Sequence, residues 1–250
     1  MPKIQKKVVE HFTKTNIYAK QWGVADPEFY EFVLPICKIL SPDSKILEVG
    51  GGSGHMLDLI KSNTFIKDLY NIEIAYKAYK GQVKENIGLI GGDALNMPFK
   101  DECFDCVLMK DVLHHLVGKT RKESKNNALK CIKESFRVLK NEGYLILLEE
   151  CNKSEIFSSI IFYVTLVLSF LGFSCKALGL RKYVIVSFLT PNEIKTLLSM
   201  SAYKIRIIIE DTKKLEVNPK MLKLTLVMST LYRQRLVIKK CTKAQQLEEV

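Results

Sequence analysis

The sequence is short of acidic residues, and this shortage bounds the partners that suit it. Its 250 residues include 27 Asp or Glu against 38 Lys or Arg, so the net charge at pH 7 is +11. A surplus of this size favours anionic partners such as nucleic acid, acidic lipid headgroups or an acidic metabolite. A solvated, lysine-rich surface accounts for the same surplus without any partner, and composition leaves both interpretations open.

A disulfide framework, a zinc motif and an apolar N-terminal leader are also lacking. The seven cysteines are an odd number scattered through apolar segments, which is typical of cytosolic proteins that use Cys as a small hydrophobe. Cys103 and Cys106 form one C-x-x-C, but no second pair or nearby His follows, so we expect no metal site. The stretch MPKIQKKVVEHF is charged from its third residue, and no secretory signal is visible in it. These features predict a cytoplasmic protein.

No internal repeat or low-complexity linker divides the chain, which suits one α/β domain over residues 1–250. Short apolar segments alternate with helical ones, and this predicts a mostly parallel sheet with helices on both faces. The predicted strands are 45–49, 69–74, 88–90, 103–109 and 144–148, with 204–210 and 232–240 as a closing pair. We expect a helical N-terminal cover over 1–40, a ligand-binding half at 45–150, an apolar insertion at 151–190, and a helix with the closing strands at 191–250.

Two helix starts are marked by capping signals. Thr120-Arg121-Lys122-Glu123 has the spacing of a capping box, and Thr190-Pro191-Asn192-Glu193 repeats it with proline at the first helical position. Gly143 is predicted to stop the first of these helices before the next strand. The N-terminal cover is expected to be helical from about residue 5, with breaks near Gly23 and Pro27.

A turn crowded with glycine follows the first predicted strand, in the pattern Glu48-x-Gly50-x-Gly52-x-Gly54. Ordering glycine costs more conformational entropy than ordering any other residue, so something must come very close to the backbone here. The dinucleotide fingerprint G-x-G-x-x-G does not fit, because the third glycine would have to stand at His55 or Leu57.

The turn and the segments after it resemble the class I S-adenosylmethionine-dependent methyltransferases, in particular the type 11 group that includes the ubiquinone and menaquinone biosynthesis enzymes. The segments YNIEIAYKAY, IGGDALNMPF, FDCVLMKDVLHHL and ESFRVLKNEGYLILLE follow in the family's order, so the resemblance covers roughly residues 45–150. It implies a Rossmann-like, mostly parallel sheet of seven strands and S-adenosylmethionine as the methyl donor. The implied cofactor-binding residues are Glu48, Gly50, Gly51, Gly52, Gly54, Glu73, Ile74, Asp93, Ala94, Lys110 and Asp111.

The resemblance also suggests roles for some of these residues. Glu73, at the end of the second strand, would accept hydrogen bonds from the two ribose hydroxyls, and Asp93 would accept one from the adenine amine. Lys110 and Asp111 would line the methionine end. Glu48 would place negative charge near a cationic sulfonium ligand.

His114 and His115 follow the fourth strand at the carboxyl edge of the sheet, where open α/β proteins bind ligands. They are the candidate general bases if the acceptor must lose a proton. In the related enzymes this pair often packs near the cofactor instead. Glu149 and Glu150 end the fifth strand at the same edge and are weaker candidates for that role.

The stretch 156–175 carries no charge and, as a helix, is about 30 Å long, which is enough to cross a bilayer. A single crossing would separate strands 204–210 and 232–240 from the sheet that they should join. We therefore expect this stretch to form a lid over a small, hydrophobic or lipid-like acceptor. The lid would be either buried against the protein or in peripheral contact with a membrane through 156–182.

Two other functions remain open at this level. The positive charge permits a nucleic-acid methyltransferase, although no N/D-P-P-Y/F or Pro-Cys motif of the base-modifying enzymes is present. A catalytically silent cofactor-binding module is the third hypothesis, since binding residues do not by themselves establish turnover.

Overall fold

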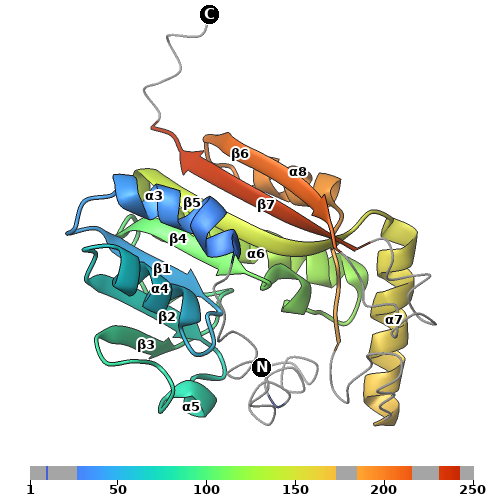
Figure 1. Ribbon diagram of the computed structural model, residues 1–250. Coiled ribbons are helices and arrows are strands. Elements are labelled where there is room, and N and C mark those ends of the chain that lie inside the picture. Colours follow the sequence, from blue (N-terminus) through green and yellow to red (C-terminus); the bar gives the residue numbers. More distant parts are fainter. Residues whose placement is uncertain (1–9, 11–26, 173–184, 216–230, 243–250) are drawn as a thin grey trace, which may run out of the picture.

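A seven-stranded sheet forms the centre of the computed structural model, which describes residues 10, 27–172, 185–215 and 231–242 (Figure 1). The strand order is β3-β2-β1-β4-β5-β7-β6. The strands are β1 Lys45–Val49, β2 Asp68–Glu73, β3 Ile87–Gly91, β4 Phe104–Lys110, β5 Leu139–Asn152, β6 Ile205–Lys214 and β7 Leu231–Lys240. Each predicted strand is present, and the predicted fold class is confirmed.

The sheet is parallel from β3 to β5 and antiparallel at β7 and β6. After β1 the chain moves outward to β2 and β3 and then returns to β4, on the other side of β1. Ligands of open α/β sheets bind at such a reversal, beyond the carboxyl ends of the strands. The fold therefore places the candidate site at the exits of β1 and β4.

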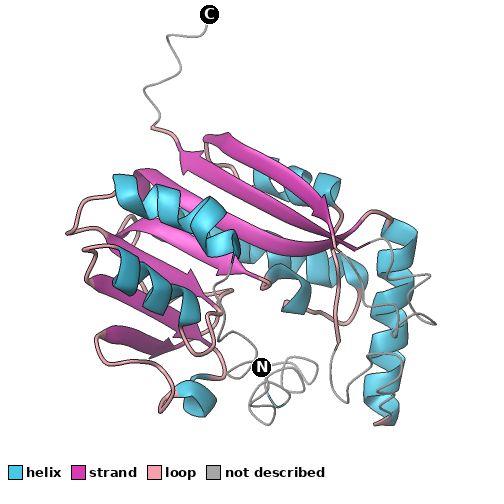
Figure 2. Ribbon diagram, in the orientation of Figure 1, coloured by secondary structure: helices cyan, strands magenta, loops and turns pink. Residues whose placement is uncertain are grey.

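Helices cover both faces of the sheet (Figure 2). They are η1 Phe29–Val33, α3 Leu34–Ile39, α4 His55–Asn63, α5 Tyr76–Tyr79, η2 Leu113–His115, α6 Arg121–Val138, α7 Glu155–Leu171 and α8 Pro191–Ser199. Ile46 and Ile146 belong to the core under η1, α3 and α4, whereas Leu47 and Leu145 belong to the core under α6 and α8. Alternate residues of one strand thus enter opposite cores, which explains the continuous apolar runs. The predicted N-terminal helix is confirmed over 27–39, and the rest of that prediction lies outside the described residues.

Both predicted helix caps are present, one of them in altered form. Thr190 and Glu193 form the full reciprocal capping box, with Pro191 at the first helical position. The Thr120 hydroxyl accepts from the Glu123 N–H at 3.1 Å, but the Glu123 carboxylate accepts from the N–H of Lys119 instead of that of Thr120. The first box therefore closes one residue earlier than the sequence predicts.

The prediction that Gly143 stops helix α6 is wrong, because α6 ends at Val138. Leu139 already pairs with Phe104 and begins β5, so the strand is longer than predicted. Sheet pairing ends the helix before any glycine is reached.

The 17-residue helix α7 begins at Glu155 and covers residues 156–171 of the charge-free stretch, and none of the described helices is both long and apolar enough to span a bilayer. The strands before and after α7 pair with each other as β5 and β7, as the argument against a single crossing requires. In Figure 1, α7 stands apart from the layers that flank the sheet. It packs through Phe162 against Val117 and Ile185, just beyond η2.

A buried lysine at the end of β7 fixes the end of α6. The Lys240 ammonium donates to the carbonyl oxygens of Phe136 at 3.0 Å and Leu139 at 2.6 Å, and it pairs with Glu102 at 3.2 Å. The last carbonyls of a helix lack partners within the helix, and a cation placed there satisfies them.

Replacement of this lysine tests the contact. Lys240→Met should lower the free energy of unfolding by about 1–3 kcal/mol, because two buried carbonyls lose a charged donor. Urea unfolding monitored by circular dichroism measures the change. The neighbouring Lys239→Met is the control, since Lys239 is more exposed and pairs with Glu142 at the surface. An equal loss in both variants would contradict the role assigned to Lys240.

Candidate functional site

The glycine turn after β1 adopts backbone conformations that other residues rarely take. Gly50, Gly52 and Gly54 have φ values of +68°, +53° and +74°. Glycine adopts positive φ without the steric cost that a Cβ imposes. These three positions therefore require glycine for the path of the chain alone.

Gly51 is required for a different reason, which lies in Glu48. A Cβ on Gly51 would stand 2.4 Å from the Glu48 carboxyl carbon, so the acid lies directly beneath the turn. Burial raises the pKa of Glu48 to about 8, with the charge of Lys110 acting against this shift and that of Glu73 adding to it. The Glu48 Oε2 atom is buried without a hydrogen-bond partner. Such an atom is costly to leave unpaired and is suited to receive a ligand's donor.

Two side chains of β2 hold the turn in place. Asn71 Oδ1 accepts from the Gly51 N–H at 3.1 Å, while its Nδ2 donates to the Gly52 carbonyl at 2.9 Å. Glu73 accepts from the N–H groups of Gly52 at 3.1 Å and Ala75 at 2.8 Å. Burial raises the pKa of Glu73, and these hydrogen bonds act against the shift. The turn is thus rigid before any ligand arrives.

These contacts change one detail of the sequence interpretation. The N–H groups of Gly51 and Gly52 already donate to Asn71 and Glu73, and that of Gly50 donates to Ile72. The glycines consequently let a ligand come close to the backbone, but the N–H groups of Gly50, Gly51 and Gly52 are already engaged. Asn71 was missed by the sequence analysis, because an Asn within an apolar strand carries no recognisable motif.

The two predicted adenine-side positions follow β3. Asp93 Oδ1 accepts from the Leu95 N–H at 2.9 Å, so one carboxylate oxygen shapes the turn. Ala94 packs against the core beside it. Ile74, half-buried at the end of β2, donates its N–H to Glu73. These three positions border the same carboxyl edge as the glycine turn.

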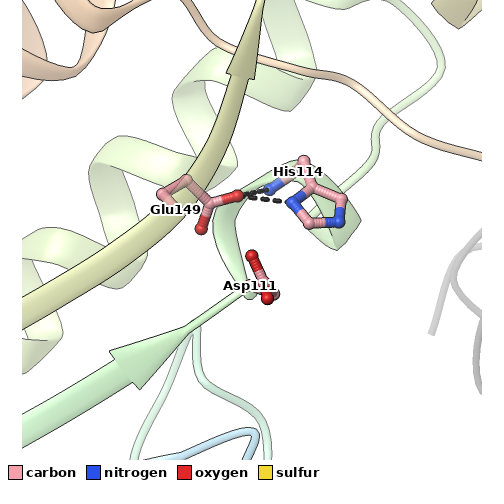
Figure 3. Close-up of side chains that lie close together, drawn as sticks. All are labelled: Asp111, His114 and Glu149. Carbon is pink, nitrogen blue, oxygen red and sulfur yellow. Dashed lines mark hydrogen bonds and ion pairs between the residues drawn. The ribbon is translucent and has the colours of Figure 1, made fainter. Parts of the chain in front are cut away.

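Glu149, at the end of β5, organises the loop that leaves β4. Its fully buried carboxylate accepts from the N–H groups of Val112 at 3.1 Å, Leu113 at 2.9 Å and His114 at 3.2 Å, and also from the His114 ring. Figure 3 shows this carboxylate reaching across to the backbone and ring of His114. The role is structural, and the sequence analysis had assigned Glu149 only as a weak candidate base.

His114 is held as a cation by this arrangement. Burial by itself lowers the pKa of His114, but the charge of Glu149 and the hydrogen bond to it, with Glu150 and Asp111, raise the pKa to about 9. A protonated imidazole cannot accept a proton at neutral pH, so this geometry does not favour His114 as a general base. His115 is half-buried, with its ring centroid 4.0 Å from that of His114, and is the better placed of the pair for that role.

Asp111, at the exit of β4, is fixed by an arginine that the sequence analysis missed. Its φ is +57°, a strained value for a non-glycine residue, and its carboxylate pairs with the guanidinium of Arg233 on β7. Arg233 also pairs with Glu28 at 3.1 Å and Glu150 at 3.5 Å. Arg233 is one of several polar residues in the β7 sequence LYRQRLVIKK, so the sequence offered no signal for this role.

Lys110, the residue before Asp111, pairs with Glu28 at 2.9 Å. Its charge also lowers the pKa of Glu48. Lys110 and Asp111 therefore lie at the predicted edge, but their charges are engaged by Glu28 and Arg233.

Asp111, His114 and Glu149 could each offer one ligand atom to a metal ion, all within 4.8 Å of one another. Figure 3 shows the three side chains together at the ends of β4 and β5. Their electron pairs are already committed, since Glu149 accepts from His114 and three N–H groups and Asp111 pairs with Arg233. We assign no metal to this cluster.

Comparison with known proteins gives one family for the central part of the chain. Residues 47–147 match the family described as a methyltransferase domain. The chain is 32% identical over 155 residues to the tRNA (carboxymethyluridine(34)-5-O)-methyltransferase of Arabidopsis thaliana, a match covering 58% of this chain and 33% of that protein. It is 27% identical over 122 residues to the ubiquinone/menaquinone biosynthesis C-methyltransferase of Vibrio cholerae, covering 45% and 44%. These matches span less than half the length of either relative.

Among solved structures, the fold is similar to that of an S-adenosylmethionine-dependent methyltransferase of Thermotoga maritima described as a possible histamine N-methyltransferase. The TM-score is 0.55 at 17% identity, and the match covers 94% of this chain and 100% of that one. At this identity the likeness supports the fold alone.

The ion pair of His114 with Glu149 should make the stability of the protein depend on pH. Because its folded pKa of about 9 exceeds the ordinary value of 6.5, the pair stabilises the protein fully below pH 6.5 and is lost as the pH rises through 9. The free energy of unfolding of the wild type should fall over this window by about 1–3 kcal/mol more than that of His114→Gln. Urea unfolding at a series of pH values measures the difference. His115→Gln is the control and should keep the wild-type slope; parallel profiles for the wild type and His114→Gln would refute the charge state assigned to His114.

Proposed function

We propose, from the premise that residues 47–147 belong to the methyltransferase domain family, that this protein is an S-adenosylmethionine-dependent methyltransferase acting on a small, apolar acceptor. The observation that carries the cofactor assignment is the unpartnered, buried Glu48 oxygen beneath a turn that only glycine can form. A ligand with a cationic centre and polar donors suits this acid, because a nearby positive charge lowers the raised pKa of Glu48 and favours its charged form, whereas a pyrophosphate compound would raise that pKa further.

The residues at the edge fit such a ligand in distinct ways. Glu73 accepts N–H groups from Gly52, Ile74 and Ala75, and of the roughly four lone-pair sites of a carboxylate it retains one for a ribose hydroxyl. Asp93 keeps one oxygen outside its turn for an exocyclic amine. Gly51 and Gly52 would allow the ligand to lie against the main chain, and Glu48 would place its charge near the cationic end.

When bound, S-adenosylmethionine supplies an activated methyl group for in-line displacement. The contribution of the protein is alignment, which requires reacting atoms at about 3–3.5 Å and a site with little water. The hydrogen bonds of Glu149 hold η2 in place, and η2 would form the wall of the site that an acceptor contacts. His115 is the group available on that wall to take a proton, should the acceptor carry one.

The apolar surroundings of η2 support the proposal of an apolar acceptor. The ring of His114 lies 5.1 Å from that of Phe188, and Val117 packs with Phe162 and Ile185 beyond it. Buried aromatic and aliphatic side chains favour apolar ligands. Incubation with labelled cofactor should therefore methylate apolar phenols or quinols. Transfer to bulk tRNA instead would overturn the acceptor class and leave the cofactor assignment standing.

Substitution in the glycine turn tests the cofactor site. Gly52→Val should abolish measurable binding of S-adenosylmethionine in calorimetry, because Val cannot adopt φ near +53° without strain and its side chain fills the approach. Gly81→Val is the matched control, since a Cβ there meets nothing within 4 Å. Circular dichroism checks that both variants fold. Undiminished affinity in Gly52→Val would place the cofactor elsewhere.

Glu73 gives a second, graded test. Glu73→Gln keeps the shape but removes the charge, so affinity for S-adenosylmethionine should weaken by about 1–3 kcal/mol, the usual effect of losing charged hydrogen bonds. Glu85→Gln serves as the control, because Glu85 is an exposed acid in the next loop. If both variants bind as tightly as the wild type, the ribose does not contact Glu73.

A further inference from the structure

Helix α7 has its polarity reversed relative to an ordinary surface helix. Its buried face carries Phe162 among three hydroxyl residues, Ser158, Thr165 and Ser169. Its exposed side carries seven large apolar side chains, which we call the α7 apolar face. They are Ile156, Ile160, Tyr163, Val164, Val167, Phe170 and Leu171, each between 39% and 73% exposed.

The spacing of these side chains aligns them along one side of the helix. Residues 156, 160, 163, 164, 167, 170 and 171 are related by intervals of three and four, so they form one stripe over about 22 Å of helix. A monomeric soluble protein rarely exposes a contiguous apolar patch of more than a few hundred Å², and larger ones mark interaction surfaces. Seven partly exposed aliphatic and aromatic residues in one stripe make such a surface.

Charge indicates what the α7 apolar face contacts. Residues 151–182 contain four basic side chains (Lys153, Lys176, Arg181 and Lys182) and one acidic side chain, Glu155. At the first turn of α7, Glu155 itself faces Lys125 at 3.5 Å. An apolar helix flanked in the sequence by more basic than acidic residues suits a surface that is apolar inside and anionic at its rim.

A second copy of the chain is a poorer match for this stripe. Each copy has a net charge of +11, so two copies would repel each other on approach.

We infer that the α7 apolar face docks on an anionic lipid surface, with α7 lying in the plane of the interface. Amphipathic helices in this position sink about 5–10 Å into the boundary between headgroups and acyl chains. No described helix is long and apolar enough to cross the bilayer, so peripheral contact is the form of binding proposed. The inference does not depend on methyl transfer, and its test needs no activity.

Co-sedimentation of the full chain with lipid vesicles tests the contact. The wild type should partition onto vesicles of equimolar phosphatidylcholine and phosphatidylglycerol, and less onto phosphatidylcholine alone. The double variant Ile160→Asp, Val167→Asp should lose about tenfold or more of this partitioning, because two charges would enter the apolar boundary. Both residues are about half exposed, so the fold should accept the change. Phe65→Asp is the control. Phe65 is 84% exposed and precedes the amino end of β2, whereas α7 follows the carboxyl end of β5.

Three results would overturn the inference. The first is absence of partitioning by the wild type, and the second is equal partitioning by the double variant and Phe65→Asp. The third is a wild-type dimer, measured by light scattering, that the double variant dissociates; this would assign the α7 apolar face to a second copy. The inference also fails if the double variant has a lower melting temperature than the wild type but partitions onto lipid equally well. That result would mean that another segment of this chain covers the face.

Discussion

Carboxylates buried at the carboxyl ends of the strands hold the loops that form the candidate site. Glu73 on β2 accepts from the turn after β1, and Glu149 on β5 accepts from the loop after β4. In each case the loop leaving one strand is fastened by an acid at the end of a neighbouring strand. A buried carboxylate is tolerated only when donors satisfy it, and here the donors are backbone N–H groups whose positions thereby become fixed. The parallel register of the sheet brings each acid within reach of its loop.

Glu48 differs from Glu73 and Glu149, and this difference determines what kind of ligand the site suits. Its carboxylate is as buried as the others, yet one oxygen has no partner and the pKa is raised to about 8. The other charges nearby are matched, since Arg233 and Lys110 together engage Asp111, Glu150 and Glu28. The unpaired oxygen of Glu48, directly beneath the glycine turn, is therefore the atom at this edge that a ligand would satisfy.

The sequence predicts what depends on local pattern. The segments 45–49 and 232–240 predict strands because each contains consecutive apolar, strand-forming residues, and the glycines of the turn are visible from their spacing. Contacts between distant segments leave no such mark. The support of the turn by Asn71, the hold of Glu149 on η2 and the pairing of Arg233 with Asp111 each join residues 20 to 122 positions apart. The end of α6 was misplaced for the same reason, because strand pairing and Lys240 decide it, not the nearby glycine.

The position of β7 bears on how the chain assembles during synthesis. β7 lies between β5 and β6 although it follows both in the sequence, so β6 has no place in the sheet until β7 arrives. A nascent chain that has emerged only as far as β6 would keep an open edge on β5 and leave Asp111 and Glu150 without Arg233. Open strand edges invite pairing with other chains, and a late, long-range insertion is slow to close. The sheet is therefore completed only after β7, which follows both of its neighbours in the sequence, has been translated, and the interval before that is the period of greatest exposure to aggregation.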